Sequence, residues 1–218
     1  MTLKEIHDFI LFMLDKEING FATSEEIDMA LDWGSMAAFN QYVAYYAETQ
    51  KFQDALAPFK KPFSFTNSTS IAGKVILPDD YLRLLSVSLL KYDNDLQKNL
   101  MTEIEVLNDD ELVERLRSQL KPVNENNPVI QWIGKGKFQI YPKTMNVGEG
   151  WYLKRPDKPK LEYYQSGREV TYDEFYSTEL EWGEGEVTNV IYRALQFLGV
   201  NLSSEQMIQY TQLKLTDA

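Results

Sequence analysis

The stretch 150–186 reads GWYLKRPDKPKLEYYQSGREVTYDEFYSTELEWGEGE, and its composition restricts the fold more than any other part of the chain. It contains two of the four tryptophans and five of the 13 tyrosines. Pro156 and Pro159 lack an N–H donor and fix φ, so the stretch cannot form one long helix. It predicts short strands and irregular backbone that carry amphipathic aromatic side chains. Such a surface indicates contacts with other protein chains and offers no catalytic centre.

The overall composition is that of a folded, acidic protein. Of its 218 residues 44% are hydrophobic and 13% aromatic, which excludes wholesale disorder. The 22 Lys and Arg residues are outnumbered by 33 Asp and Glu residues, giving a formal net charge of −11. A protein that grips nucleic-acid phosphates needs clustered cations, so this balance argues against that function. It fits an assembly component, or a surface past which DNA slides without sticking. It also fits a merely solubilising surface.

The residue types that carry most catalytic and metal chemistry are scarce. Because the chain has no cysteine, disulfides, thiolate catalysis and Cys-based metal sites are excluded. The one histidine, His7, lies in an amphipathic helical pattern, where we expect a partly exposed structural residue. The N-terminus has no basic region followed by a clean apolar run, so we expect neither a signal peptide nor a membrane span. We therefore expect no enzyme activity, no cofactor and no metal site.

Residues 1–60 predict an N-terminal helical hairpin. Two pairs of residues have the three-residue spacing of a capping box, namely Thr2 with Glu5 and Thr23 with Glu26. The second helical stretch is expected to run to about Leu56, with a kink or division at Gly34. The apolar stripes of the two helices are expected to face each other.

Residues 61–183 predict a central antiparallel β region with one inserted helix. The expected strands are 61–65, 73–77, 84–92, 103–107, 129–133, 138–141 and 151–153. Asn108 or Asp109 begins the inserted helix, which is expected to end near Leu120. The residues Gly134 to Lys137 join a β-hairpin, and 147–150 are expected to form a turn.

Residues 184–218 predict C-terminal helices that pack on the N-terminal hairpin. The first is expected from Gly185 to Leu198, with Gly199 as its stop, and a last helix near 204–213 is capped by Ser203. Because the strands are short and do not alternate regularly with helices, the fold class is α+β rather than a parallel α/β sheet.

Acidic pairs occur at three places, and each has an ordinary structural interpretation. Asp79-Asp80, Asp109-Asp110 and Glu184 with Glu186 are expected at helix N-termini, where carboxylates satisfy free N–H groups. A glycosidase or a nuclease that uses Asp and Glu remains the alternative from the enzyme class.

Several segments, in this order and spacing, resemble the ring or head–tail adaptor proteins of tailed phages, most closely those of crAss-like phages. The segments are Asn19-Gly20-Phe21, Ser24 to Leu31, Leu56 to Lys60, Leu77 to Tyr81, Asn127-Pro128, Ile140 to Pro142, Tyr152 to Pro156, Leu180 to Trp182 and Leu198 to Leu202. Together they extend over nearly the whole chain. Each is degenerate by itself, and none is a catalytic signature.

The resemblance implies a virion structural protein that forms a ring, commonly twelve-fold, around the DNA channel of the portal–tail connector. Its implied partners are further copies of itself, the portal protein and the neighbouring tail ring proteins, with packaged DNA passing through the lumen without specific binding. It implies localisation in the virion after synthesis in the host cytoplasm. A ring further down the tail, near the baseplate, is the alternative within this class.

Five aromatic residues are candidates for contacts between subunits. They are Trp151, Tyr152, Trp182, Tyr45 and Tyr46. The last two belong to a helical stretch whose aromatic residues cover more than one face, which indicates that a neighbouring chain covers the remainder. For Trp182 an intramolecular core position is almost equally consistent. A different alternative is an isolated binding module that uses Trp151, Tyr152, Tyr163 and Tyr164 as a stacking platform.

Overall fold

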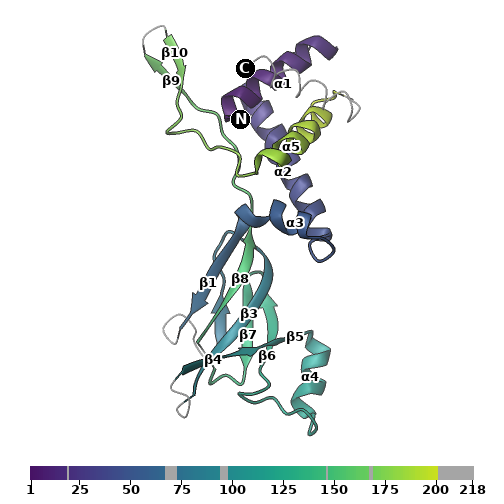
Figure 1. Cartoon of the computed structure of the whole chain (residues 1–218), viewed down its shortest axis with the longest axis vertical. Helices are drawn as coiled ribbons and strands as arrows, with labels where there is room; N and C mark the ends of the chain where they lie inside the picture. The colour runs from purple at the N-terminus through teal and green to yellow at the C-terminus, as the bar shows by residue number, and fades with distance from the viewer. Residues whose placement is uncertain (19, 67–72, 94–97, 146, 167–168, 201–218) are drawn as a thin grey trace. The chain divides into compact units, whose positions relative to one another are not determined.

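A computed structural model describes residues 1–18, 20–66, 73–93, 98–145, 147–166 and 169–200, and it confirms the α+β class. The chain divides into two compact units (Figure 1). Unit 1 comprises Met1–Phe59 and Pro156–Ala218, and unit 2 comprises Lys60–Arg155. The predicted β-rich region extended to residue 183, whereas in the structure the part from Pro156 onward belongs to unit 1. One reason is that the Leu161 N–H donates to the carboxylate of Asp28 in unit 1, at 3.2 Å.

The described part of unit 1 is built around four α-helices. They are α1 (Leu3–Ile18), α2 (Ser24–Ala44), α3 (Gln50–Ala55) and α5 (Glu184–Phe197). Both predicted capping boxes are present. The Glu5 N–H donates to Thr2 Oγ1 at 3.3 Å, and the Thr2 N–H donates to Glu5 Oε2 at 2.8 Å. Thr23 and Glu26 repeat this pair of bonds at 3.3 and 2.8 Å. Each box satisfies N–H groups that a helix start leaves without a partner.

The predicted division of the second helix at Gly34 is wrong. Gly34 lies inside an uninterrupted α2, and the helix instead ends at Ala44 before α3 begins at Gln50. A Cβ placed on Gly34 would lie 2.7 Å from the carbonyl oxygen of Val190 in α5. The glycine therefore permits a close approach of two helices. The most extensive helix contacts of α2 are with α5 rather than with α1, which corrects the expected facing of the first two helices.

The C-terminal helix is confirmed in its described part. α5 ends at Phe197, and Gly199 has a φ of +91°, a left-handed conformation that favours glycine after a helix. The predicted last helix near 204–213 lies outside the described residues. Within the second chain segment of unit 1, β9 (Tyr163–Ser166) and β10 (Glu169–Tyr172) form an antiparallel hairpin, which we call the arm.

Within its described residues, unit 2 contains two four-stranded sheets and one helix (Figure 1). The first sheet has the order β1 (Lys60–Phe65), β8 (Gly148–Lys154), β3 (Tyr81–Asp93) and β4 (Lys98–Glu103). The second has the order β2 (Lys74–Ile76), β7 (Lys137–Tyr141), β6 (Val129–Gly134) and β5 (Glu105–Leu107). Apolar side chains from both sheets, including Phe65, Leu89, Ile130 and Phe138, form one buried cluster. The pairs are antiparallel apart from β5 with β6.

The hairpin and the inserted helix of unit 2 are where the sequence predicts them. β6 and β7 pair across Lys135-Gly136, and Gly136 has a φ of +65°. The helix α4 (Asp109–Arg117) begins at a capping box between Asn108 and Glu111 and ends three residues before the predicted Leu120. Capping boxes and glycine turns depend only on residues a few positions apart, so the folded protein retains them.

Two predictions in unit 2 are wrong. Gly148 and Gly150 do not form a turn but lie in β8, because the Phe65 and Phe63 rings occupy the space of their side chains. A Cβ would lie 2.5 Å from the Phe65 ring at Gly148 and 2.7 Å from the Phe63 ring at Gly150. The pair Asp79-Asp80 does not begin a helix. It forms the turn before β3, which starts at Tyr81.

Candidate interaction surfaces

Tyr152, one of the five predicted interface residues, is an interior residue of unit 2. It is only 3% exposed and points from β8 toward the Phe63 and Tyr81 rings, with centroids 6.1 and 6.2 Å away. Its hydroxyl donates to Asp80 Oδ1 at 2.9 Å. Burial, and then this bond to a carboxylate, raise the pKa of Tyr152 to about 12. Asp80 also accepts from Lys61 Nζ at 3.3 Å, so its carboxylate joins the turn to β1 and β8.

Trp182 is an interior residue of unit 1. It is 6% exposed, and its ring packs edge-on against Phe59 and Tyr42, with centroids 4.6 and 5.8 Å away. Its Nε1–H donates to Ser35 Oγ at 2.7 Å, and Ser35 is itself buried in α2. Trp182 and Tyr152 thus expose almost no surface to a neighbouring chain.

Beside Trp182, a polar group of side chains joins α2 to α5. The Tyr42 hydroxyl donates to Glu186 and accepts from Asn189 Nδ2, the latter at 2.8 Å. Burial, followed by the bond to the Glu186 carboxylate, raises the pKa of Tyr42 to about 12. Glu186 is therefore held inside unit 1 as a hydrogen-bond acceptor. From the sequence, Glu186 is expected only as a carboxylate at a helix N-terminus.

The other three predicted interface residues lie nearer the surface. Trp151 points to the opposite side of β8 from Tyr152 and is 42% exposed, with Lys60 Nζ 4.9 Å from its ring centroid. Tyr45, at the end of α2, is 44% exposed and has a ring contact with Phe52 at 5.7 Å. Tyr46 is partly buried. These residues stay candidates for contacts with other chains.

The most exposed aromatic pair was not singled out from the sequence. Phe175 and Tyr176 are 86% and 70% exposed, and their rings meet edge-on at 5.1 Å. Asp173 Oδ1 accepts the N–H groups of both residues, at 3.1 and 3.2 Å, so the backbone of the turn is held in place. The signal available in the sequence is an Asp directly before Glu-Phe-Tyr, a spacing typical of a side chain that caps its own turn.

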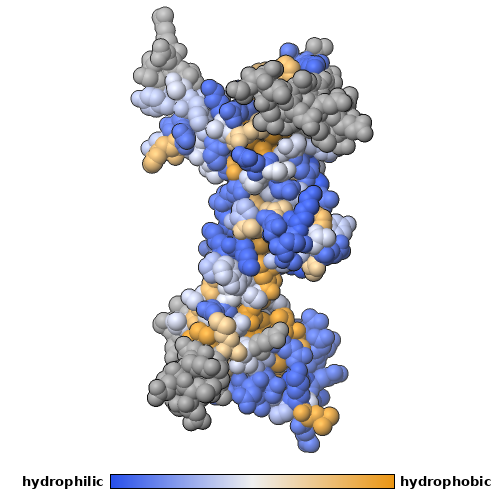
Figure 2. All heavy atoms as spheres, viewed as in Figure 1, coloured by the Kyte–Doolittle hydropathy of each residue, from blue (hydrophilic) through white to orange (hydrophobic). Residues whose placement is uncertain are grey.

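The predicted stacking platform is divided between the two units. Tyr163 and Tyr164 are in β9 of unit 1 and are 46% and 62% exposed, whereas Trp151 and Tyr152 are in unit 2. Figure 2 shows apolar residues on the surface of both units, set among hydrophilic ones. The exposed aromatics thus belong to several surfaces of the chain, and four of them lie on or beside the arm.

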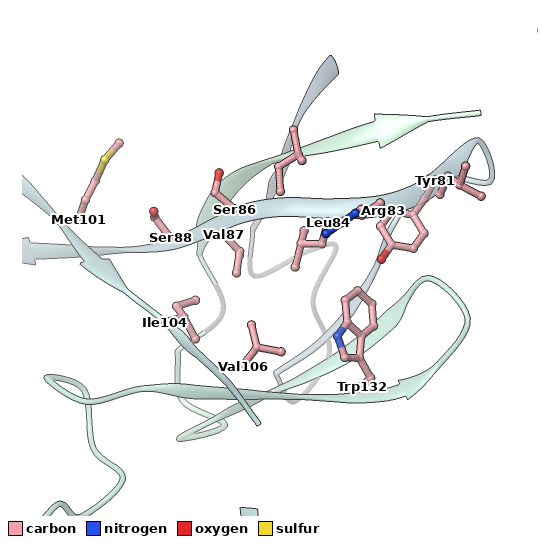
Figure 3. A pocket seen from close by; sticks show the side chains of 12 residues that line it. Tyr81, Arg83, Leu84, Ser86, Val87, Ser88, Met101, Ile104, Val106 and Trp132 are labelled. Carbon is pink, nitrogen blue, oxygen red and sulfur yellow. The ribbon is translucent and has the colours of Figure 1, made fainter. Parts of the chain in front are cut away.

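A groove of about 730 Å³ follows β3 in unit 2 (Figure 3). Leu84 and Val87 point from β3 toward Val106 in β5, Trp132 in β6 and Ile104, which lies between β4 and β5. Met101 and Val106 are 64% and 49% exposed, so apolar side chains remain accessible in it. Among the described residues that line the groove, Arg83 is the one charged residue. Its lining is suited to an apolar ligand or protein segment.

Two of the candidate acid–base residues, His7 and Asp109, have structural partners. His7 is 2% exposed, which corrects the expected partial exposure, and its Nε2 lies 2.8 Å from Asp28 Oδ1. Asp109 accepts from Gln131 Nε2 at 2.7 Å at the start of α4. Within the described ranges, no group of three His, Asp or Glu side chains is arranged to hold a metal ion. In the same ranges, none of the helices is long and apolar enough to cross a membrane.

Comparison with models of known protein families gives no match to this chain. Comparison with curated protein sequences also gives no significant similarity.

Proposed function

We propose that this protein is a subunit of a closed ring in the head–tail connector of a tailed phage, with a structural rather than a catalytic role. The ordered series of segments that resemble phage ring and adaptor proteins supports the proposal, and so does the net charge of −11. An acidic lumen would repel DNA phosphates and let the genome pass without sticking.

The structural observation that carries the proposal is the exposure of large aromatic side chains on a turn whose backbone is held by hydrogen bonds. Single exposed apolar residues are normal on a monomer, but Phe175 and Tyr176 form a contiguous pair on a fixed turn. Tyr164, in the adjoining arm, is 62% exposed. Aromatic residues are enriched at protein interfaces, and a surface that meets a different surface on the next copy generates a ring when the rotation closes.

The proposed partners follow from this position. Each subunit contacts two further copies, and the ring contacts the portal protein on one side and a tail ring protein on the other. We expect twelve copies, because that number is common in the proteins that the sequence resembles. The protein is then located in the virion after synthesis in the host cytoplasm, with no cofactor and no membrane contact.

Native mass spectrometry and electron microscopy of the purified chain, alone and mixed with the portal protein, test the proposal. We expect a closed ring in at least one of the two samples, and density for this chain between portal and tail in virions. A chain that stays monomeric in both samples, or that lies in the capsid shell or a fibre, would overturn it. A ring of another copy number would change only the stoichiometry. A position further down the tail would favour the tail-ring alternative.

Binding of DNA provides an independent test. At physiological salt we expect no retardation of linear double-stranded DNA by the purified ring in gel electrophoresis, because the acidic excess disfavours phosphate contacts. Tight, salt-sensitive binding would contradict the proposed DNA-repelling lumen.

A further inference from the structure

Half of β3 has a strand on one side only. β8 pairs with β3 from Tyr81 to Leu89, whereas β4 pairs with it only from Ser88 to Asp93. In the described part of the chain, no strand therefore lies along Leu84–Val87 on the side of β4. Such an edge exposes backbone N–H and C=O groups and is a template for pairing with another chain.

The groove of about 730 Å³ lies at this edge. Consecutive residues of β3, from Tyr81 to Ser88, all line it. Because successive side chains of a strand point to opposite faces, a hollow lined by all of them follows the edge of the strand and not one face. Figure 3 shows the space that remains between β3 and the strands bearing Ile104, Val106 and Trp132. Extended peptides bind such edges through main-chain bonds, with side-chain pockets for specificity.

The arm in unit 1 has the complementary properties. β9 and β10 pair with each other, and among the described residues no third strand extends this sheet. An isolated two-stranded hairpin is at most marginally stable in water, so a further strand would stabilise it. β10 is four residues long, and among the described residues the side of β3 that β4 leaves unpaired extends from Tyr81 to Val87, so this edge is long enough for the whole of β10. The aromatic turn with Phe175 and Tyr176 follows β10 directly.

The charges of the two surfaces are also complementary. The aromatic turn contains Asp173 and Glu174, whereas Arg83 is the one charged residue among the described residues that line the groove. Opposite charges steer association and fix the register, while like charges on both surfaces would disfavour it.

We propose that the arm of one copy docks on the neighbouring copy, with β10 beside Leu84–Val87 of β3 and the aromatic turn in the groove. This inference rests on the proposed ring, and it names the surfaces that join its subunits. The contact is heterologous, because an arm meets a groove, so an open series of copies has a free arm at one end and a free groove at the other until the ring closes.

Cross-linking between differently substituted chains tests the docking directly. The protein has no cysteine, so Ser86→Cys in the groove and Thr171→Cys in β10 each introduce the only thiol, and both positions are exposed. The two variants, one carrying a size tag, are mixed and oxidised. Only a contact between chains can then join groove to arm. We expect a mixed disulfide, since its formation requires Cα atoms within about 7 Å. Ser64→Cys on β1, at the opposite edge of the same sheet, is the matched control and should give none.

The self-association of a variant with a charge in the groove is a second test, and it does not depend on the register of β10 beside β3. Met101 lines the groove and is 64% exposed, so Met101→Lys removes little of the core. We expect it to weaken self-association about tenfold or more, measured by sedimentation against concentration. Met29→Lys in α2, at a residue 57% exposed, is the control and should associate as the unchanged protein does.

The outcomes separate the docking from the ring. A ring of the unchanged protein, with no mixed disulfide and with normal association of Met101→Lys, would overturn the docking and leave the ring standing. A Thr171→Cys variant that links only to itself would also overturn it, because arms would then pair with arms. An unchanged protein that stays monomeric with and without the portal protein would overturn both.

Discussion

Replacing Trp182 by Ala separates a core residue from an interface residue. The structure places this side chain inside unit 1, 6% exposed, against the Phe59 and Tyr42 rings and bonded to Ser35. We therefore expect the substitution to destabilise the single chain, with no dependence on contacts between copies.

The expected loss of stability follows from the contacts of the Trp182 side chain. Removal of a fully buried Trp or Phe side chain costs about 3–5 kcal/mol, through lost burial and the cavity that remains. Trp182→Phe keeps most of the ring contacts but removes the donor to Ser35 Oγ, which is itself 1% exposed. A buried partner left without its hydrogen bond costs about 1–3 kcal/mol. We expect a loss of about 4 kcal/mol for Trp182→Ala and about 2 kcal/mol for Trp182→Phe.

The free energy of unfolding is measured by urea denaturation followed by far-ultraviolet circular dichroism, at several protein concentrations. Trp151→Ala is the matched control, because Trp151 is 42% exposed and its main described ring partner is Lys60. Its loss should be about 1 kcal/mol or less. A residue that acts in the core lowers stability equally at every concentration, whereas an interface residue does so only where the chains associate.

The reasoning would be refuted by a Trp182→Ala loss no larger than that of Trp151→Ala. It would equally fail if the loss vanished in dilute, monomeric protein. Either result would indicate that Trp182 contacts a neighbouring subunit.

Three further predictions concern close packing and pH. Gly34→Ala should lower the melting temperature of unit 1, because its Cβ would lie 2.7 Å from a carbonyl of α5; Gly185→Ala, with nothing within 4 Å, should leave it unchanged or raise it. Gly150→Ala should prevent the first sheet of unit 2 from forming, since its Cβ would lie 2.3 Å from a backbone oxygen of β3, whereas Gly134→Ala has open space and should fold normally in circular dichroism. The pKa of Tyr152 is raised from 10.0 to about 12, so the native state holds this proton longer than the unfolded chain. The contribution of this proton to the free energy of unfolding is complete below pH 10 and is lost as the pH rises to about 12, by at most about 1.4 kcal/mol per pH unit. In urea denaturation, Tyr152→Phe should make the free energy of unfolding fall less steeply with pH over this range, and the same dependence on pH in both proteins would contradict the prediction.

Local interactions could be predicted from the sequence because both partners lie within a few residues. The capping boxes at Thr2 and Thr23 are present with the predicted glutamates, each three residues later, and the inserted helix begins after Asn108, one of its two predicted caps. The β6–β7 hairpin and the glycine stop after α5 are further examples. In each case the backbone geometry depends on the residue itself and on its immediate neighbours.

The candidate interaction surfaces could be predicted only in part. An aromatic side chain is equally suited to a core and to an interface, so composition alone cannot separate Trp182 from Trp151. Their exposures, 6% and 42%, are set by what the remainder of the chain places beside them. The groove beside β3 depends on where β4 stops pairing, which is a property of the sheet and not of either strand.

The sequence by itself therefore determined the helix starts at Thr2, Thr23 and Asn108, the hairpin turn, the α+β class and the acidic net charge, since these follow from short-range bonds and composition. The tertiary structure decided the rest. The sequence pattern predicts a break at Gly34, but this glycine permits a close approach of α5. The pattern also predicts a turn at Gly148 and Gly150, but these glycines leave room for two phenylalanine rings. A glycine has no side chain to indicate which neighbour needs the space. That neighbour lies far away in the sequence, so only the folded chain identifies it.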